Sequence, residues 1–186
     1  MLLSVPGRSG KLKWWFLFFL FLTAAFIIWM KNFLYPLGSG DIVELEMAKT
    51  SERAAAIIQQ WRENGKFQPA IQSIYCDYVF IFLYTITIYL GCRYLSSLTS
   101  NEILARTGKL FSYLVFAAAI FDIVENVAML SSLQNGLTNN QVSLTHKMAI
   151  SKFSIILMTL FYIGICFISC LANYIEKKIN KRVSLE

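Results

Sequence analysis

The sequence predicts an all-α integral membrane protein, a bundle of four membrane-spanning helices in a single domain that covers residues 1–186. Hydrophobic residues make up 56% of the chain and charged residues only 15%, which is too apolar for a soluble domain of this length. Apolar runs recur along the chain, and each approaches the roughly 20 residues that a helix needs to cross the hydrocarbon layer. We place the spans at about 14–35, 71–94, 110–130 and 149–174, with an amphipathic segment at about 38–66.

The distribution of basic residues predicts how the chain is oriented. The net charge of +6 does not indicate a nucleic-acid partner, because Lys and Arg flank the apolar runs instead of forming one patch. Basic residues gather before span one, between spans two and three and in the C-terminal tail, whereas the loop after span three contains only Lys147. Cytoplasmic loops carry the excess of Lys and Arg. We therefore expect a multi-pass cell membrane protein with both termini in the cytoplasm and the amphipathic segment outside. The counted residues are Arg8, Lys11, Lys13, Arg93, Arg106, Lys109, Lys177, Lys178, Lys181 and Arg182.

The first apolar run begins like a secretory signal, with basic residues followed by a hydrophobic stretch. It is long for a signal core, and the residues that follow it, 31–36, contain no small-x-small cleavage site. Trp14 and Trp15 lie at one end of the run and Trp29 lies at the other, as is typical of residues at membrane interfaces. The pattern predicts an uncleaved first span.

The amphipathic segment predicts one or two short helices that lie on the membrane or over the mouth of the bundle. Apolar residues recur at helical spacing, and Thr50 or Ser51 is placed to cap a second helix that ends near Asn64-Gly65. The acidic residues of the segment are most simply a solvated face; alternatively, one of them reaches into the bundle. These residues are Glu44, Glu46, Glu52 and Glu63.

The third span contains polar residues that need a reason to be there. Asp122, Glu125 and Asn126 stand at positions i, i+3 and i+4 of an apolar run, so they share one face of a helix. Ionisable side chains at membrane depth are costly and are functional candidates by default. Span two contributes Asp77 and, two turns further along, Tyr84. The predicted directions of the spans bring Asp77 and Glu125 to a similar depth, so we expect all five side chains to form a polar pocket in the outer half.

Basic residues near the same depth are candidate partners for these acids. They are Lys31 near the outer end of span one, and His146, Lys147 and Lys152 near the start of span four. Pairing lowers the cost of desolvation, and two acids one helical turn apart are expected to share a proton.

A structural interpretation of the same residues stays open. Buried polar residues in membrane bundles also join helices, so Asn126 can be a simple interhelical contact and Tyr84 a packing residue. His146 is expected to be an ordinary surface or capping residue. A hard cation held by Asp77, Asp122 and Glu125 is an alternative, but no spacing is diagnostic, so we predict neither a metal nor a cofactor.

The four cysteines predict no disulfide framework. Cys76, Cys92, Cys166 and Cys170 lie in or beside apolar segments, and none belongs to a C-x-x-C pair. We interpret them as packing residues, with redox chemistry as the alternative.

Short motifs across residues 38–130 resemble a family of small bacterial four-span membrane proteins that has no assigned activity. The motifs are Ile42-Val43-x-Leu45-Glu46-x-Ala48-x-Thr50, Ile57-Ile58-x-x-Trp61, Asp77-x-x-Phe80-x-x-x-Tyr84 and, in the third span, Asp122-x-x-Glu125-Asn126. The resemblance implies a shared architecture in a bacterial inner membrane and a shared site that includes Glu46 and Trp61 near its mouth. It implies no reaction.

Three functions are compatible with the pattern. The first is a polar pocket in the outer half that binds or transports a small amphipathic or cationic ligand or protons. The second is an enzyme that acts on a lipid or isoprenoid-like substrate, with Asp122 or Glu125 as general acid or base. The third is a structural or accessory subunit. The bilayer is the expected partner, and a homodimer is an alternative that would supply a transport path. A single histidine and the absence of Gly-x-Ser-x-Gly exclude the common histidine-rich and serine-hydrolase sites.

Overall fold

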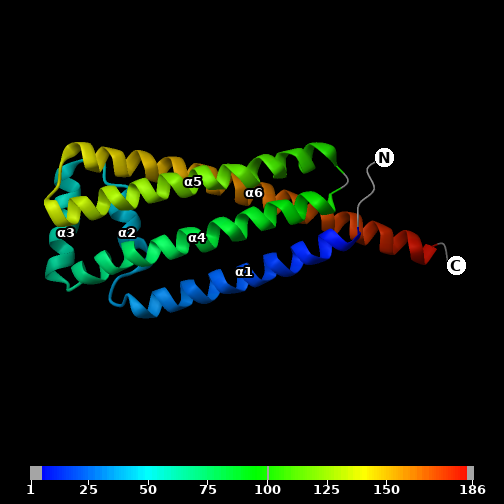
Figure 1. The fold of residues 1–186 in the computed structure, drawn as a ribbon, viewed down its shortest axis with the longest axis horizontal. Helices are drawn as coiled ribbons and strands as arrows, with labels where there is room; N and C mark the ends of the chain where they lie inside the picture. Colours follow the sequence, from blue (N-terminus) through cyan, green and yellow to red (C-terminus); the bar gives the residue numbers. More distant parts are fainter. Residues whose placement is uncertain (1–5, 100, 184–186) are drawn as a thin grey trace.

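The computed structural model describes residues 6–99 and 101–183, and all regular structure in these residues is helical. Four long helices run along the molecule, and two short ones lie across one end (Figure 1). Their bounds are α1 Pro6–Phe33, α2 Ser39–Glu46, α3 Ser51–Glu63, α4 Phe67–Leu98, α5 Glu102–Asn135 and α6 Asn139–Val183. The all-α four-helix bundle that the sequence predicts is confirmed.

All four predicted spans correspond to helices that are long and apolar enough to cross a membrane. The candidate spans are Gly10–Phe33, Phe67–Leu98, Glu102–Asn135 and Asn139–Asn173. Most are longer than the apolar runs, because the helices continue into polar residues that hydropathy does not detect. These four helices make the chain a multi-pass integral membrane protein.

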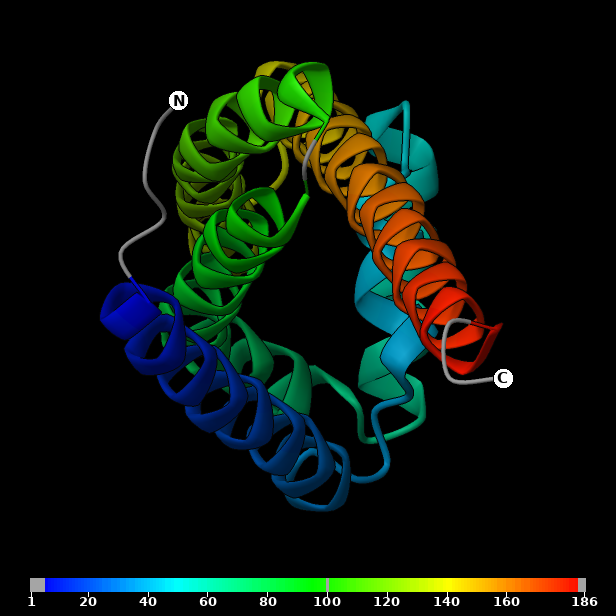
Figure 2. The same ribbon diagram turned by 90° about the vertical axis from the view of Figure 1, so that its right-hand side faces the viewer.

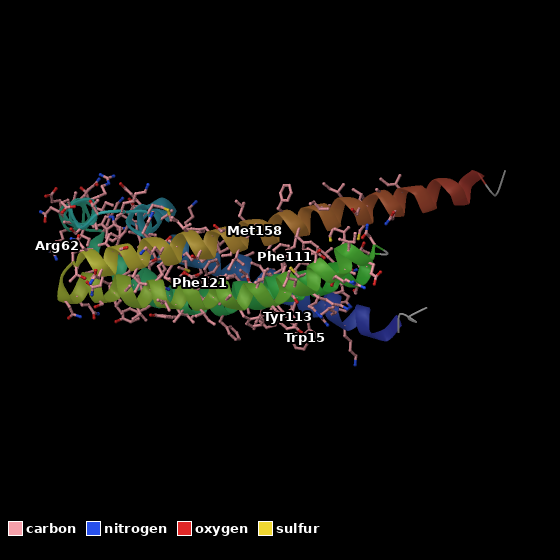
Figure 3. The ribbon with its side chains drawn as sticks, turned by 90° about the horizontal axis from the view of Figure 1, so that it is seen from above. Trp15, Arg62, Phe111, Tyr113, Phe121 and Met158 are labelled. Carbon is pink, nitrogen blue, oxygen red and sulfur yellow. The ribbon has the colours of Figure 1, made fainter. Side chains whose placement is uncertain are left out.

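The long helices pack in sequence order around the bundle. Helix α4 packs against α1 and α5, and α6 packs mainly against α5 and less extensively against α4 (Figure 2). Helix α1 is peripheral, since only 6% of the residues in its most apolar stretch are buried. Its aromatic side chains, such as Trp15, lie on the outer surface together with Tyr113 of α5 (Figure 3). These exposed apolar faces are the expected lipid contacts.

One close approach fixes how α5 meets α6. A Cβ on Gly108 would lie 2.0 Å from the Tyr162 hydroxyl oxygen, so no larger residue fits there without a shift. Tyr162 also donates a hydrogen bond to the Leu104 carbonyl at 3.0 Å. Beside this contact Cys92 and Cys166 are fully buried with free thiols, in agreement with a packing role for them.

The amphipathic segment forms two short helices, α2 and α3, where the sequence predicted one or two. Thr50 caps α3 by accepting a hydrogen bond from the Arg53 amide at 3.3 Å, and Gly65 follows the C-cap with a φ of 67°. Only glycine adopts such a φ routinely. Helices α2 and α3 close the end of the bundle opposite the start of α1 and the end of α6 (Figure 1). Which side of the membrane this end faces stays a prediction.

Apolar residues under α2 and α3 form the largest core. Leu45, Ile57 and Trp61 from the short helices meet Ile74 of α4 and Met129 of α5. A second apolar cluster, further along the bundle, includes Ile81 and Val115. The polar residues of α5 lie between these two clusters in the sequence, so they are buried between apolar layers.

Candidate functional site: a buried lysine among three carboxyl groups

The Lys152 ammonium is bound by three carboxyl groups from two other helices. Its Nζ lies 2.7 Å from Asp122 Oδ1, 3.0 Å from Glu125 Oε1 and 3.2 Å from Glu46 Oε1. Lys152 belongs to α6, Asp122 and Glu125 to α5, and Glu46 to α2. We call these four residues the Lys152 cluster. It joins the cap helix α2 to the membrane-spanning bundle.

All members of the cluster are removed from solvent. Their side chains are at most 6% exposed, and that of Glu125 is fully buried. Moving a charged group out of water costs several kcal/mol unless partners compensate. The ammonium provides three hydrogen bonds, which satisfies the donors of Lys152 completely.

The carboxyl groups are satisfied unequally. The second oxygen of Asp122 accepts a hydrogen bond from the Tyr84 hydroxyl at 2.9 Å. Glu46 Oε2 and Glu125 Oε2 are buried and accept no hydrogen bond from any residue that the structure describes. Glu125 Oε2 does lie 3.0 Å from Lys152 Nζ, so it belongs to the ion pair although it accepts no hydrogen bond. The cluster therefore contains two oxygens that could accept a further proton.

Asp77 and Asn126 extend the polar region by one helical turn. The Asn126 amide donates to Asp77 Oδ2 at 2.6 Å, which joins α5 to α4. Asn126 is buried and Asp77 is half-buried. Since Asn126 follows Asp122 by four residues, the two sets of contacts lie on one face of α5.

The formal charges of the cluster do not balance. Three carboxylates and one ammonium leave two negative charges, and Asp77 adds a third beside them. Like charges in a buried site cannot all stay ionised, so at least one carboxyl group must hold a proton or attract a cation. This is the chemical property that the arrangement provides.

The structure brings together most of the residues that the sequence singles out. Asp77, Tyr84, Asp122, Glu125 and Asn126 converge as the helix directions require. The amphipathic segment reaches into the bundle through Glu46. This is the alternative that the sequence left open to a fully solvated acidic face. The other three acidic residues, Glu44, Glu52 and Glu63, are exposed.

Other sequence candidates lie outside the network. Trp61 is buried in the apolar core under α3, not at an open mouth. Among the basic candidates only Lys152 joins the acids, since Lys31 and Lys147 are exposed. His146 is half-buried, and within residues 6–99 and 101–183 no hydrogen bond connects its buried Nδ1 to another group.

The described residues hold no cluster of three His, Cys, Asp or Glu side chains that suits a metal ion. The position between the acids is taken by the Lys152 ammonium itself. Two hollows of the described chain lie elsewhere. A groove of about 570 Å³ is lined by residues of α2, of the connection between α2 and α3 and by one residue of α3. A hollow of about 10 Å³, roughly one water molecule, is lined by apolar side chains and two hydroxyls.

Gly38-Ser39-Gly40-Asp41 matches the Gly-x-Gly-Asp pattern of membrane aspartyl proteases, but its environment does not suit that chemistry. Burial raises the pKa of Asp41, but hydrogen bonds from Lys66 Nζ at 2.9 Å and from the Gly38 amide outweigh this and hold the pKa below its ordinary value. An aspartyl protease needs two aspartates that share a proton. Within the described residues no hydrogen bond or ion pair joins Asp41 to another acid.

No protein-family model, curated protein or solved structure matches the chain. The resemblance to small bacterial four-span proteins therefore stays a prediction, and the geometry of the Lys152 cluster is the observation that bears on function.

Proposed function

We propose that this integral membrane protein binds and releases protons at the Lys152 cluster. The observation that supports the proposal is the excess of buried carboxyl groups over the single ammonium. A proton neutralises one of the excess charges and supplies a hydrogen-bond donor to oxygens that have none. Carboxyl groups inside membrane bundles commonly serve proton pathways.

A proton suits the closed cluster better than a larger ligand. Lys152 occupies the place that a cation would take between Asp122 and Glu125. The 570 Å³ groove is lined by other residues. A proton needs no additional volume, whereas an amphipathic or cationic ligand requires the cluster to open first. Binding of such a ligand is therefore a second step of the proposal, to be tested after proton binding.

Proton exchange can be measured directly on the purified protein. A pH-sensitive dye in weakly buffered detergent solution reports protons released after a pH jump, and infrared spectroscopy reports protonated carboxyl groups through their C=O band. We expect wild-type protein to show both signals. The variant with Asp122→Asn and Glu125→Gln loses them, whereas Glu44→Gln, at an exposed carboxylate of α2, leaves the infrared band of the buried carboxyl unchanged. Equal proton release and an equal buried C=O band in the double variant would refute the proposal.

A structural role is the second candidate, because the contacts of Lys152 join α2, α5 and α6. The two roles differ in what neutralisation does. Replacing a buried ion network by neutral side chains of similar size is often neutral or stabilising by about 1–4 kcal/mol. A variant with Glu46→Gln, Asp122→Asn, Glu125→Gln and Lys152→Met is expected to fold without proton exchange. Failure of this variant to fold, together with silent proton exchange in wild type, would favour the structural role.

Catalysis on a lipid or isoprenoid-like substrate makes a different demand on the same carboxyl groups. A general acid must lie within about 3 Å of the atom to which it gives its proton. A lipid bound beside Asp122 or Glu125 in protein purified from membranes would supply that geometry. Mass spectrometry of lipids that remain bound to wild type but not to Asp122→Asn tests this alternative.

A further inference from the structure

Two neighbouring carboxyl groups on different helices, those of Glu46 and Glu125, flank the same ammonium. Glu46 Oε1 lies 3.2 Å from Lys152 Nζ, and both oxygens of Glu125 lie 3.0 Å from it. Within the described residues, the buried Oε2 atoms of Glu46 and Glu125 accept no hydrogen bond. Two ionised carboxylates in this arrangement repel each other, whereas one proton between them provides a donor and an acceptor.

The position of Glu46 in its helix increases the need for that proton. Glu46 is the last residue of α2, and the last turn of α2 contains no basic residue. The C-terminus of a helix carries partial negative charge, so an ionised glutamate there is unfavourable. Protonation removes this repulsion together with the repulsion from Glu125.

Helix α2 depends on its contacts with the bundle. It has eight residues, and isolated helices of this length are not stable in water. Leu45 and Ala48 anchor it in the apolar core, and Glu46 connects it to Lys152. Figure 1 shows α2 and α3 across the end of the bundle, so a displaced α2 would uncover the cluster from that end.

We infer that Glu46 and Glu125 share one proton, and that this proton holds α2 closed over the Lys152 cluster. The inference rests on the proposed proton-binding function and extends it to a gate. When the proton leaves for the aqueous phase, the O–H bond breaks, both carboxyl groups are charged, and α2 moves outward with Glu46. The closed state binds one more proton than the open state, so its population falls as pH rises.

Charged groups on α4, α5 and α6 act on Glu46. Lys152 of α6 attracts it, whereas Asp122 and Glu125 of α5 and Asp77 of α4 repel it. On α3, Arg53 pairs with Glu44 instead. The hydrogen bond from the ammonium to Glu46, at 3.2 Å, is the longest of the three that it donates, and Glu46 lies on the short helix α2. This hydrogen bond is therefore the first contact to be lost when the negative charge increases.

Hydrogen–deuterium exchange of α2 tests the gate in the full-length protein, reconstituted in lipid nanodiscs. Exchange of the amides of residues 41–47 is measured across a pH series and corrected for the intrinsic chemical rate. Linkage to a single proton limits the increase in corrected exchange to about tenfold per pH unit above the point of release. We expect an increase that approaches this limit.

Matched variants distinguish the effect of the shared proton from a general change in the stability of α2. Glu46→Gln retains a donor for Glu125 but has no proton to release, so α2 should exchange slowly at every pH. Glu125→Gln tests the same contact from α5 and should give the same result. Glu44→Gln lies on the same helix but is exposed and pairs with Arg53, so the pH dependence of wild type should persist.

Corrected exchange of wild-type α2 that does not change with pH would overturn the inference, as would a wild-type pH dependence in Glu46→Gln. Proton release measured on the same preparation distinguishes failure of the gate from failure of the proposed proton-binding function. Proton release with pH-independent α2 exchange refutes only the gate. Absence of proton release refutes the proposed function and the gate together.

Discussion

Replacing Lys152 by methionine tests whether the buried carboxyl groups are charged. Methionine preserves much of the apolar volume but removes the ammonium that lies 2.7–3.2 Å from oxygens of three acids. Removing one partner of a buried ion pair typically costs about 3–5 kcal/mol. For a chain of 186 residues, 1 kcal/mol corresponds to about 2–4 °C in Tm, so we expect Tm to fall by about 10 °C.

The pH dependence of this effect has a definite sign. Without the ammonium, the carboxyl groups must take up protons for the variant to fold, so the folded variant binds more protons than folded wild type. Stability decreases with pH wherever the folded state binds more protons than the unfolded state. The difference in Tm between wild type and Lys152→Met should therefore increase as pH rises.

Thermal unfolding in detergent micelles, followed by the fluorescence of the four tryptophans, measures both effects. Lys147→Met is the matched control, because Lys147 is an exposed lysine of the same helix. We expect it to change Tm by less than about 2 °C, as surface substitutions do. A similarly small, pH-independent change in Lys152→Met would contradict this prediction, since it would mean that the ammonium does not compensate buried negative charge.

Three further substitutions test a hydrogen bond to the cluster, the contact between α5 and α6, and an ion pair at the start of α2. Tyr84→Phe removes a 2.9 Å hydrogen bond to a cluster carboxyl and should lower the free energy of unfolding by about 1.5–3 kcal/mol, measured by thermal unfolding. Gly108→Ala places a methyl group 2.0 Å from the Tyr162 hydroxyl oxygen and should destabilise the α5–α6 contact by about 1–3 kcal/mol in the same assay. The pKa of Asp41 is lowered from the ordinary value of 3.8, so its ion pair with Lys66 stabilises α2 at pH values above 3.8. This stabilisation is lost as the pH falls below that value and Asp41 takes up a proton. Asp41→Asn should therefore increase amide exchange at the start of α2 at neutral pH, and this increase should disappear once the pH falls well below 3.8, where Asp41 is protonated in the wild type too.

The sequence was sufficient to predict the fold because the bilayer imposes a strong constraint on it. Every backbone polar group within hydrocarbon must be satisfied internally, so long apolar runs have to be helices. Hydropathy does not locate the helix ends, because no change in backbone structure accompanies the change from apolar to polar side chains. The fourth predicted span ends near residue 174, yet α6 continues to Val183.

The site was predictable where a single helix carries its geometry. The spacing of Asp122, Glu125 and Asn126 places them on one face in any α-helix. Partners from other helices depend on rotation and depth, which the sequence does not specify. Lys152 was therefore one of four basic candidates, and Glu46 entered through a resemblance and as an alternative to a solvated face. A signal that distinguishes it is its place at the end of a short helix, directly after Leu45 and two residues before Ala48, both of which are buried.

The composition of the cluster argues against a role in stability alone. A bundle that only needed to join α2, α5 and α6 would be held as well by apolar side chains, because desolvating charges consumes most of what their attraction provides. The nearby core shows this, since Leu45, Ile57 and Met129 pack the same cap without any charge. The Lys152 cluster differs from this apolar core, because it has three acids around one lysine. The excess acids repel each other and require a proton. This repulsion acts at the contact between the short helix α2 and the bundle, which is where the proposed gate opens when one proton leaves. The arrangement is therefore better suited to responding to protons than to holding the bundle together.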